Sequence, residues 1–288
     1  MQSRTSFALL AAVLAVSLLG CQESGFDESK ETVRPLKVQH VLGETKVPGQ
    51  AEHPMTLTLD SLDDTLALHV RPARAAVPGA RLPAYLRAEG SGVSLMRPVT
   101  AADLAAVEAV DPDLIIGSAG TDGRSGQGYL YDRLSRIAPT VMLALGGGQW
   151  KLNLRLMGEA LGRTNDAEQL LIDYDHEAFR ARKAIRAERS GEGKPRVAVA
   201  LATRSGVRFA KESSFAGTIL ADAGVKQVLN VGDADVTLLA RAPGAQVAAG
   251  SLSGRIEAVS AALWWGPGGS MAALTALTEL TNARLGGG

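Results

Sequence analysis

The feature that most limits the fold is one long helical segment near the middle of the chain. Residues 166–189 contain neither Gly nor Pro, and apolar residues recur among them at helical spacing. A helix of this length extends about 36 Å, at a rise of about 1.5 Å per residue. We expect a break before it at 162–165 and an end in the turn-forming stretch 190–195. Such a helix is long enough to join two separate lobes.

On the N-terminal side of this segment, short β-rich runs alternate with helical ones. The run 113–118 is continuously apolar, as expected of a strand buried in a parallel sheet. Two helices are predicted to begin at Ser61 and Thr100, each with an acid, Asp64 or Asp103, three residues later. The expected elements are strands at 55–59, 73–77, 113–118 and 140–145, and helices at 61–68, 101–110 and 128–137. This alternation predicts a parallel sheet covered by helices.

A second alternating set follows the long segment. Its expected elements are strands at 196–202, 236–240 and 255–259, a turn at 204–206, and helices at 214–223 and 270–284. The predicted fold class is therefore α/β, with two Rossmann-like lobes that have parallel sheets and are joined by one long helix. We expect the N-terminal lobe over 36–150, the interlobe helical segment over 151–190 and the C-terminal lobe over 191–288.

The start of the chain is typical of an export signal. Arg4 precedes an apolar run, 7–19, that is too short to span a bilayer but suits a signal peptide. The polar stretch that follows has almost nothing to bury and suits a flexible tether. We therefore expect a signal peptide at 1–20 and a tether at 21–35.

One cysteine stands at the boundary between the two. Cys21 is the only cysteine of the chain, so a disulfide within the chain is excluded. The sequence Leu-Leu-Gly-Cys at 18–21 resembles the bacterial lipobox, in which the signal is cut before the Cys and the thiol carries lipid. An ordinary secretory signal is the alternative.

Composition and motifs disfavour several other functions. Lys plus Arg and Asp plus Glu both number 30, so no basic excess indicates nucleic acid. The Gly-rich loop 117–128 lacks the Lys-Ser/Thr of a phosphate-binding P-loop. The four histidines are scattered, which disfavours a serine-hydrolase triad and a bare zinc or manganese site. We expect neither an enzyme nor a resident metal or cofactor.

Several stretches together carry a resemblance to a known family. They are HVLGETKVPGQAEHPMTLTLDSLDDTLALHVRP (40–72), LAAVEAVDPDLIIGS (104–118), LYDRLSRIAPTV (130–141), WKLNLRLMGEALGR (150–163) and ESSFAGTILADAGV (212–225). With two lobes, one joining helix and a lipobox, the chain resembles the substrate-binding lipoproteins of iron-siderophore and cobalamin ABC importers. The resemblance implies a class III periplasmic-binding-protein fold.

The resemblance also implies a function and a location. The protein would be lipid-anchored at the extracytoplasmic face of the cell membrane, where it would capture a ferric siderophore as a monomer and deliver it to an ABC permease. The alternatives are a non-transport sensor or a degenerate paralogue on the same scaffold, or haem or cobalamin as the ligand.

Three features depart from the family pattern. His69 stands where the family usually has Gly, and a left-handed backbone there would be strained. The C-terminal lobe looks shortened, because only 226–233 separates Gly224 from the next strand. The family's permease-docking Glu would fall on Ala105, which leaves Glu108, about one helical turn on, as the predicted docking residue.

Ligand contacts are expected in the loops after the carboxyl ends of the strands. Arg suits the charged oxygens of large, mostly anionic ferric siderophores, and aromatic rings suit their apolar faces. The predicted ligand-binding residues are Arg81, Tyr85, Arg124, Trp150, Arg204, Arg208 and Trp265. Arg81 and Arg124 could instead be solvated loop charges, and one of Trp264 and Trp265 is expected in the core.

Overall fold

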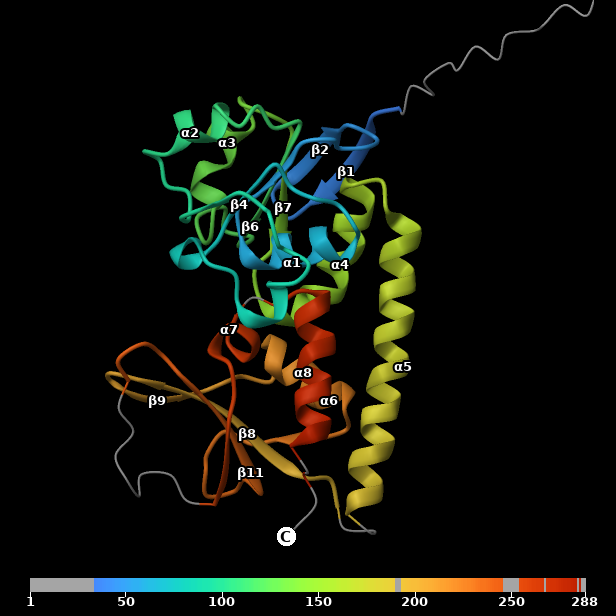
Figure 1. Cartoon of the computed structure of the whole chain (residues 1–288), viewed down its shortest axis with the longest axis vertical. Coiled ribbons are helices and arrows are strands. Elements are labelled where there is room, and N and C mark those ends of the chain that lie inside the picture. Colours follow the sequence, from blue (N-terminus) through green and yellow to red (C-terminus); the bar gives the residue numbers. More distant parts are fainter. Residues whose placement is uncertain (1–33, 190–192, 246–253, 267, 284, 286–288) are drawn as a thin grey trace, which may run out of the picture. The chain divides into compact units, whose positions relative to one another are not determined.

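The computed structural model describes residues 34–189, 193–245, 254–266, 268–283 and 285. These residues belong to one compact unit. Two sheets lie at its opposite ends, with long helices running from one to the other (Figure 1). The expected signal peptide, Cys21 and most of the tether at 21–35 lie outside the described residues.

The N-terminal lobe is built on a parallel sheet of the order β5-β4-β3-β6-β7. All six residues of β6 are buried, as its apolar run predicts. The strands are β3 (Pro54–Thr56), β4 (Arg74–Ala76), β5 (Leu95–Met96), β6 (Leu114–Ala119) and β7 (Thr140–Ala144). An antiparallel hairpin that the sequence did not predict, β1 (Leu36–His40) and β2 (Gly43–Val47), packs beside β7.

The helices of this lobe begin at other residues than those predicted. In α1 (Leu59–Ala67) the N-cap is Thr58, and Ser61 is its reciprocal capping partner rather than the cap itself. The helix α2 (Leu104–Glu108) starts late because the Asp103 carboxylate accepts hydrogen bonds from the Thr100 N–H and hydroxyl, at 2.8 and 2.6 Å, which folds 100–103 into a turn. The third helix is α3 (Tyr131–Leu134), preceded by a 3-10 turn.

The backbone is left-handed two residues after the end of α1, at the position where the resembled family usually has Gly. His69 has a φ of 58°, in the left-handed region. A side chain in this conformation is strained, because its Cβ approaches the neighbouring backbone.

The C-terminal lobe has a sheet of the order β10-β8-β11-β12, with an unpredicted β9 antiparallel to β8. Residues 228–235 join β10 to β11 without a helix, in keeping with the short spacing in the sequence. The elements are β8 (Arg196–Thr203), β9 (Gly206–Phe209), α6 (Phe215–Asp222), β10 (Lys226–Gln227), β11 (Val236–Arg241), β12 (Arg255–Ala258), α7 (Ala261–Trp264) and α8 (Ser270–Asn282).

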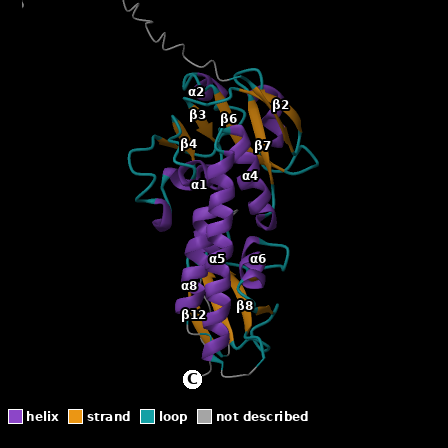
Figure 2. Ribbon diagram, turned by 90° about the vertical axis from the view of Figure 1, so that its right-hand side faces the viewer, coloured by secondary structure: helices purple, strands orange, loops and turns teal. Residues whose placement is uncertain are grey.

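The helix α4 (Trp150–Ala160) packs on the N-terminal lobe, and α5 (Thr164–Glu188) runs from there to the C-terminal lobe (Figure 1). The buried residues of α5 recur every three or four positions, as the sequence pattern predicts: Ala167, Leu171, Tyr174, Ala178, Ala181 and Ile185. Figure 2 shows α5 and α8 side by side along the face of the molecule. The predicted two-lobed α/β fold with one long joining helix is confirmed.

Candidate ligand-binding cleft

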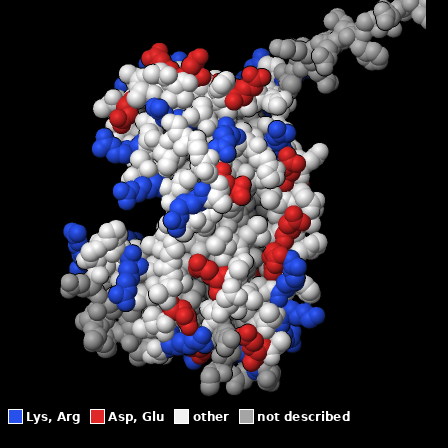
Figure 3. Space-filling view, viewed as in Figure 1, with Lys and Arg blue, Asp and Glu red and all other residues white. Residues whose placement is uncertain are grey.

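A cavity of about 710 Å³ lies between the two lobes. It opens where the molecule is hollowed, at the left of Figure 3, and Lys and Arg side chains lie on both edges of the hollow. The N-terminal lobe contributes Leu57, Thr58, Leu59, Ala76, Pro78, Arg81, Leu82, Pro83, Pro98 and Gln127, and the C-terminal lobe contributes Leu201, Ala242, Pro243, Ala261, Ala262, Trp265 and Gly266.

The topology explains why these residues meet. The wall residues of the N-terminal lobe follow β3, β4, β5 and β6, and those of the C-terminal lobe lie near the ends of β8, β11 and β12. Because parallel strands end at the same edge of a sheet, the loops beyond their carboxyl ends gather in one place. The two sheets present these edges to each other across the cleft.

The charges at the cleft are positive. Arg81 is the one charged residue among the described residues that line the cavity. Arg208 is not among the lining residues but stacks on one of them, Trp265, with its guanidinium carbon 5.9 Å from the centre of the ring. Arg204, at the β8–β9 turn, lies against Gly244, next to the wall residues Ala242 and Pro243. Such a site favours an anion with apolar surface.

The two adjacent tryptophans have different places. Trp264 is buried, and its indole N–H donates to Glu279 Oε2 at 2.8 Å. Trp265 is partly exposed and forms part of the cleft wall. The sequence left this choice open, and the packing of α7 decides it.

Two of the predicted contacts are corrected by the structure. Trp150 is only 1% exposed and packs edge-on against Tyr174, with ring centres 4.6 Å apart, so it belongs to the core between α4 and α5. Tyr85 lies behind the wall, where its hydroxyl hydrogen-bonds Asp63. Burial and the nearby Asp63 raise the pKa of this phenol, which keeps it protonated and donating.

Two other predicted residues lie outside the cavity. Arg124 is exposed in the loop after β6, where its N–H donates to Asp122 Oδ1 at 3.0 Å. Glu108 is exposed at the last residue of α2, and Ala105 is exposed on the same helix. Glu108 and Ala105 are therefore accessible to a partner protein, but neither belongs to the cleft wall.

The sequence reading missed several wall residues. Pro78, Pro83 and Pro98 follow β4 and β5, and Gln127 lies at the end of the Gly-rich loop. The rule that ligands lie beyond the carboxyl ends of strands points to the loops that contain them. They are Pro and Gln, whereas the predicted contacts are confined to the Arg, Tyr and Trp side chains of these loops.

Within the described part of the chain, no three or more His, Cys, Asp or Glu side chains gather as metal ligands would. Nor does any described helix combine the length and apolar character needed to cross a membrane. His40 is partly buried against Tyr131 and Thr45, and its burial lowers the pKa of the imidazole.

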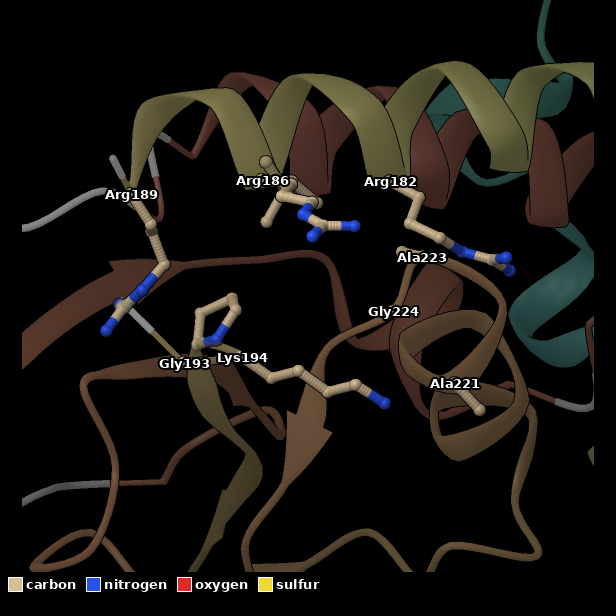
Figure 4. Close-up of a pocket in the computed structure, with 10 residues that line it drawn as sticks. Arg182, Arg186, Arg189, Gly193, Lys194, Ala221, Ala223 and Gly224 are labelled. Atoms are coloured by element: carbon tan, nitrogen blue, oxygen red, sulfur yellow. The ribbon is translucent and has the colours of Figure 1, made fainter. Parts of the chain in front are cut away.

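A second cavity, of about 580 Å³, lies between α5, α6 and the start of β8. In Figure 4, Arg186 and Lys194 extend toward it from opposite sides. Arg182 is already bonded to the backbone carbonyl of Asp222, at 2.6 Å from Nη2. Arg189 donates to Asp235 Oδ2 at 3.3 Å. Of the four cations that line this cavity, two therefore already donate hydrogen bonds to oxygens of the protein.

A family model described as periplasmic binding protein matches residues 56–242. A probable siderophore-binding lipoprotein, YfiY, of Bacillus subtilis (strain 168) is 28% identical over 172 residues, which are 59% of this chain and 51% of that protein. An achromobactin-binding periplasmic protein of Dickeya dadantii (strain 3937) is 29% identical over 59% of this chain and 54% of its own. The chain thus spans about half the length of the curated relatives it matches.

Solved structures share the fold. The crystal structure of Staphylococcus aureus SirA complexed with staphyloferrin B has a TM-score of 0.72 and 22% identity, and the match covers 86% of this chain and 98% of that one. The petrobactin-binding protein YclQ from Bacillus subtilis has a TM-score of 0.70 and 19% identity, with 87% and 99% covered. At these identities the likeness is one of fold.

Proposed function

The chain belongs to the periplasmic binding protein family, and from this premise we propose that it captures a ferric siderophore in the interlobe cleft. The observation that carries the proposal is the cleft itself. A cavity of about 710 Å³ lies within the size range of small-molecule sites, and its described wall combines apolar surface with Arg81 and contains no carboxylate.

The chemistry of the wall matches this class of ligand. Carboxylate and catecholate siderophores present charged oxygens around the iron and apolar or aromatic surface beyond it. Arg81 and Arg208 offer guanidinium donors for the oxygens, and Trp265 offers a ring face for the apolar part. The names of the curated relatives, which include siderophore and achromobactin binding, favour a ferric siderophore over haem or cobalamin.

Titration of intrinsic tryptophan fluorescence tests the proposal. The probes are the ferric complexes of staphyloferrin B, petrobactin and achromobactin, with the iron-free siderophores and haem as controls. We expect saturable binding of at least one ferric complex and weaker binding of its iron-free form. Binding of haem alone, or of none of these probes, would contradict the proposal.

The proposal extends to import. A lipid on Cys21, after removal of the signal at 1–20, would hold the lobes near a permease through the tether at 21–35. We expect Cys21→Ala to abolish incorporation of a labelled fatty acid and to release the protein from the membrane, or to leave it held by an uncleaved signal. Label that persists on this variant would refute the anchor.

Docking to the permease is assigned to Glu108. It is exposed at the end of α2, and Ala105, at the family's docking position, is exposed without a charge. In cells that lack their own binding protein, we expect Glu108→Gln to lower iron uptake and Ala105→Glu to raise it. If neither variant changes uptake, docking uses other contacts.

The exposed Ala105 also favours a second candidate, a binding protein on this scaffold that is not coupled to import. Such a protein would pass the fluorescence test and fail the uptake test in the wild-type form.

A further inference from the structure

Two buried carboxylates of one lobe hold the first residues of the last helix. Asp63 and Asp64 lie on α1 and are 0% and 1% exposed. The Met271 and Ala272 N–H groups donate to Asp63 Oδ1 and Oδ2 at 2.8 and 3.0 Å, and the Ser270 N–H donates to Asp64 Oδ1 at 2.8 Å. The three donors are more than 200 positions away along the chain.

These donors are the ones that an α-helix leaves unpaired at its start. The first N–H groups of α8 have no carbonyl partner within the helix. Its N-cap is Gly269, which has no side chain to accept them. The carboxyl oxygens of Asp63 and Asp64 on α1 therefore cap these N–H groups. Figure 1 shows the start of α8 directly below α1.

The segment that leads into α8 fits closely on both sides. A Cβ on Gly269 would lie 2.6 Å from Asp63 Cγ. A Cβ on Gly268, whose φ is 65°, would lie 2.3 Å from Phe215 Cδ2 on α6. The segment is thus held against the N-terminal lobe at one residue and against the C-terminal lobe at the residue before it.

The same contacts reach the cleft wall. Trp265 and Gly266 line the cavity only a few residues before Ser270. Leu59, the first residue of α1, lines it from the other lobe, one helical turn before Asp63. Tyr85, which hydrogen-bonds Asp63, follows the wall residues of the loop after β4. Asp63 therefore connects three parts of the wall: the segment before α8, the start of α1 and the loop after β4.

We propose that Asp63 and Asp64 are positioning residues of the cleft, which fix Trp265 by capping α8 across the two lobes. This inference rests on the proposed function only for its binding consequence, since the placement of Trp265 is a property of the ligand-free protein. The carboxylates touch no ligand in this proposal and act through α8.

The test compares three variants with the wild type. Asp63→Ala removes both acceptors from Met271 and Ala272, Asp63→Asn keeps the volume and one acceptor, and Gly269→Ala presses on the same contact from the side of α8. Asp132→Asn, an exposed acid on α3, is the matched control. Each protein is also made with Trp265→Phe, so that the difference spectrum reports the emission of Trp265 alone.

We expect a red-shifted Trp265 emission in Asp63→Ala and Gly269→Ala, a smaller shift in Asp63→Asn, and none in Asp132→Asn. Affinity for the ferric complex that binds the wild type should fall about tenfold in Asp63→Ala and less in Asp63→Asn. A folded Asp63→Ala with unchanged Trp265 emission and affinity would overturn the proposal. Should Asp63→Ala not fold, unchanged emission in Gly269→Ala and Asp63→Asn would do so.

The two proposals fail separately. If the wild type binds no ferric complex but the emission shifts as expected, the proposed function is wrong and the positioning role stands. If the wild type binds and the emission does not move, the positioning role is wrong.

Discussion

The interlobe cleft and the basic cavity beside α5 have similar volumes, about 710 and 580 Å³, but their cations have different surroundings. In the basic cavity, Arg182 is bonded to the carbonyl of Asp222 and Arg189 to the carboxylate of Asp235. At the cleft, Arg81 forms no hydrogen bond or ion pair with the described residues, and Arg208 lies over an aromatic ring.

The difference shows that a count of cations does not identify an anion site. An Arg whose donors already meet protein oxygens gains little from a ligand, because those bonds must first break. A helix C-terminus, such as that of α6 beside Arg182, also repels an anion. The cleft offers donors that the fold leaves unused, at the edge where α/β sheets bind ligands.

The largest expected effect tests how rigidly the cleft wall is built. Gly268→Ala places a Cβ 2.3 Å from Phe215 at a φ of 65°, and we expect it to lower the free energy of unfolding by about 3 kcal/mol, through overpacking and strain. Gly79→Ala is the matched control, since Gly79 has the same φ of 65° and open space around it. Its cost should be about 1 kcal/mol, from backbone strain alone.

Urea unfolding measures both variants. Equal costs for Gly268→Ala and Gly79→Ala would mean that Phe215 and the segment before α8 move apart easily. The cleft wall would then not be rigidly built.

The next effect separates the two cavities directly. Arg81→Gln and Arg208→Gln should each weaken a bound ferric siderophore by about 1.5 kcal/mol, roughly tenfold, through loss of a charge-assisted hydrogen bond. Arg204→Gln should do the same if the ligand reaches the β8–β9 turn. Arg186→Gln, which removes an exposed cation of the basic cavity, should change the affinity less than twofold. Calorimetric titration gives all four values.

A loss of affinity in Arg186→Gln as large as that in Arg81→Gln would reverse the assignment of the two cavities. Unchanged affinity in both Arg81→Gln and Arg208→Gln would show that neither guanidinium contacts the ligand.

The smallest effect concerns the carboxylates behind the wall. Burial raises the pKa of the Asp63 carboxyl to about 7 from an ordinary 3.8, and burial together with Asp63 raises that of Asp64. The other groups that act on them are Asp60 on the same helix, the Tyr85 hydroxyl, and the N–H groups at the start of α8.

The sign of the pH dependence follows from these directions. A raised pKa means that the folded protein binds the proton of Asp63 more tightly than the unfolded chain does. Its contribution to stability is therefore present at low pH and is lost as the pH rises through about 7. Between pH 6 and pH 8 we expect Asp63 alone to lower the free energy of unfolding by about 1.4 kcal/mol.

The measurement is a series of urea unfolding curves across this range. The decrease should be smaller in Asp63→Asn, where Asp64 alone retains a raised pKa, and unchanged in Asp132→Asn. The same pH dependence in Asp63→Asn as in the wild type would assign the titration to other groups.

The sequence determined the parts of the molecule that rest on local interactions. The bounds of α5 and β6 were predicted to within two residues, because helical periodicity and a continuous apolar run are properties of the segment itself. The rule for the ends of parallel strands was enough to select Arg81, which does line the cleft, and the pair Trp264 and Trp265, of which only the structure shows that Trp265 lines it. The signal peptide and the lipid anchor on Cys21 stay predictions from the sequence.

What the sequence could not give depends on contacts between distant segments. The short β5 and β10 are strands only because they pair with β4 and β8. Trp150 begins a helix after a strand, a position typical of a ligand residue, but its side chain packs against Tyr174 in the core.

Asp64 shows this most clearly. In the sequence it reads as an ordinary acid in the first turn of a helix, a place that usually faces solvent. The structure buries it against Ser270, because α8 returns to α1 from the other end of the chain and brings N–H groups that need an acceptor. Only the tertiary structure could decide this, because burial of a charge depends on the partner that arrives, and the partner of Asp64 lies 206 residues away.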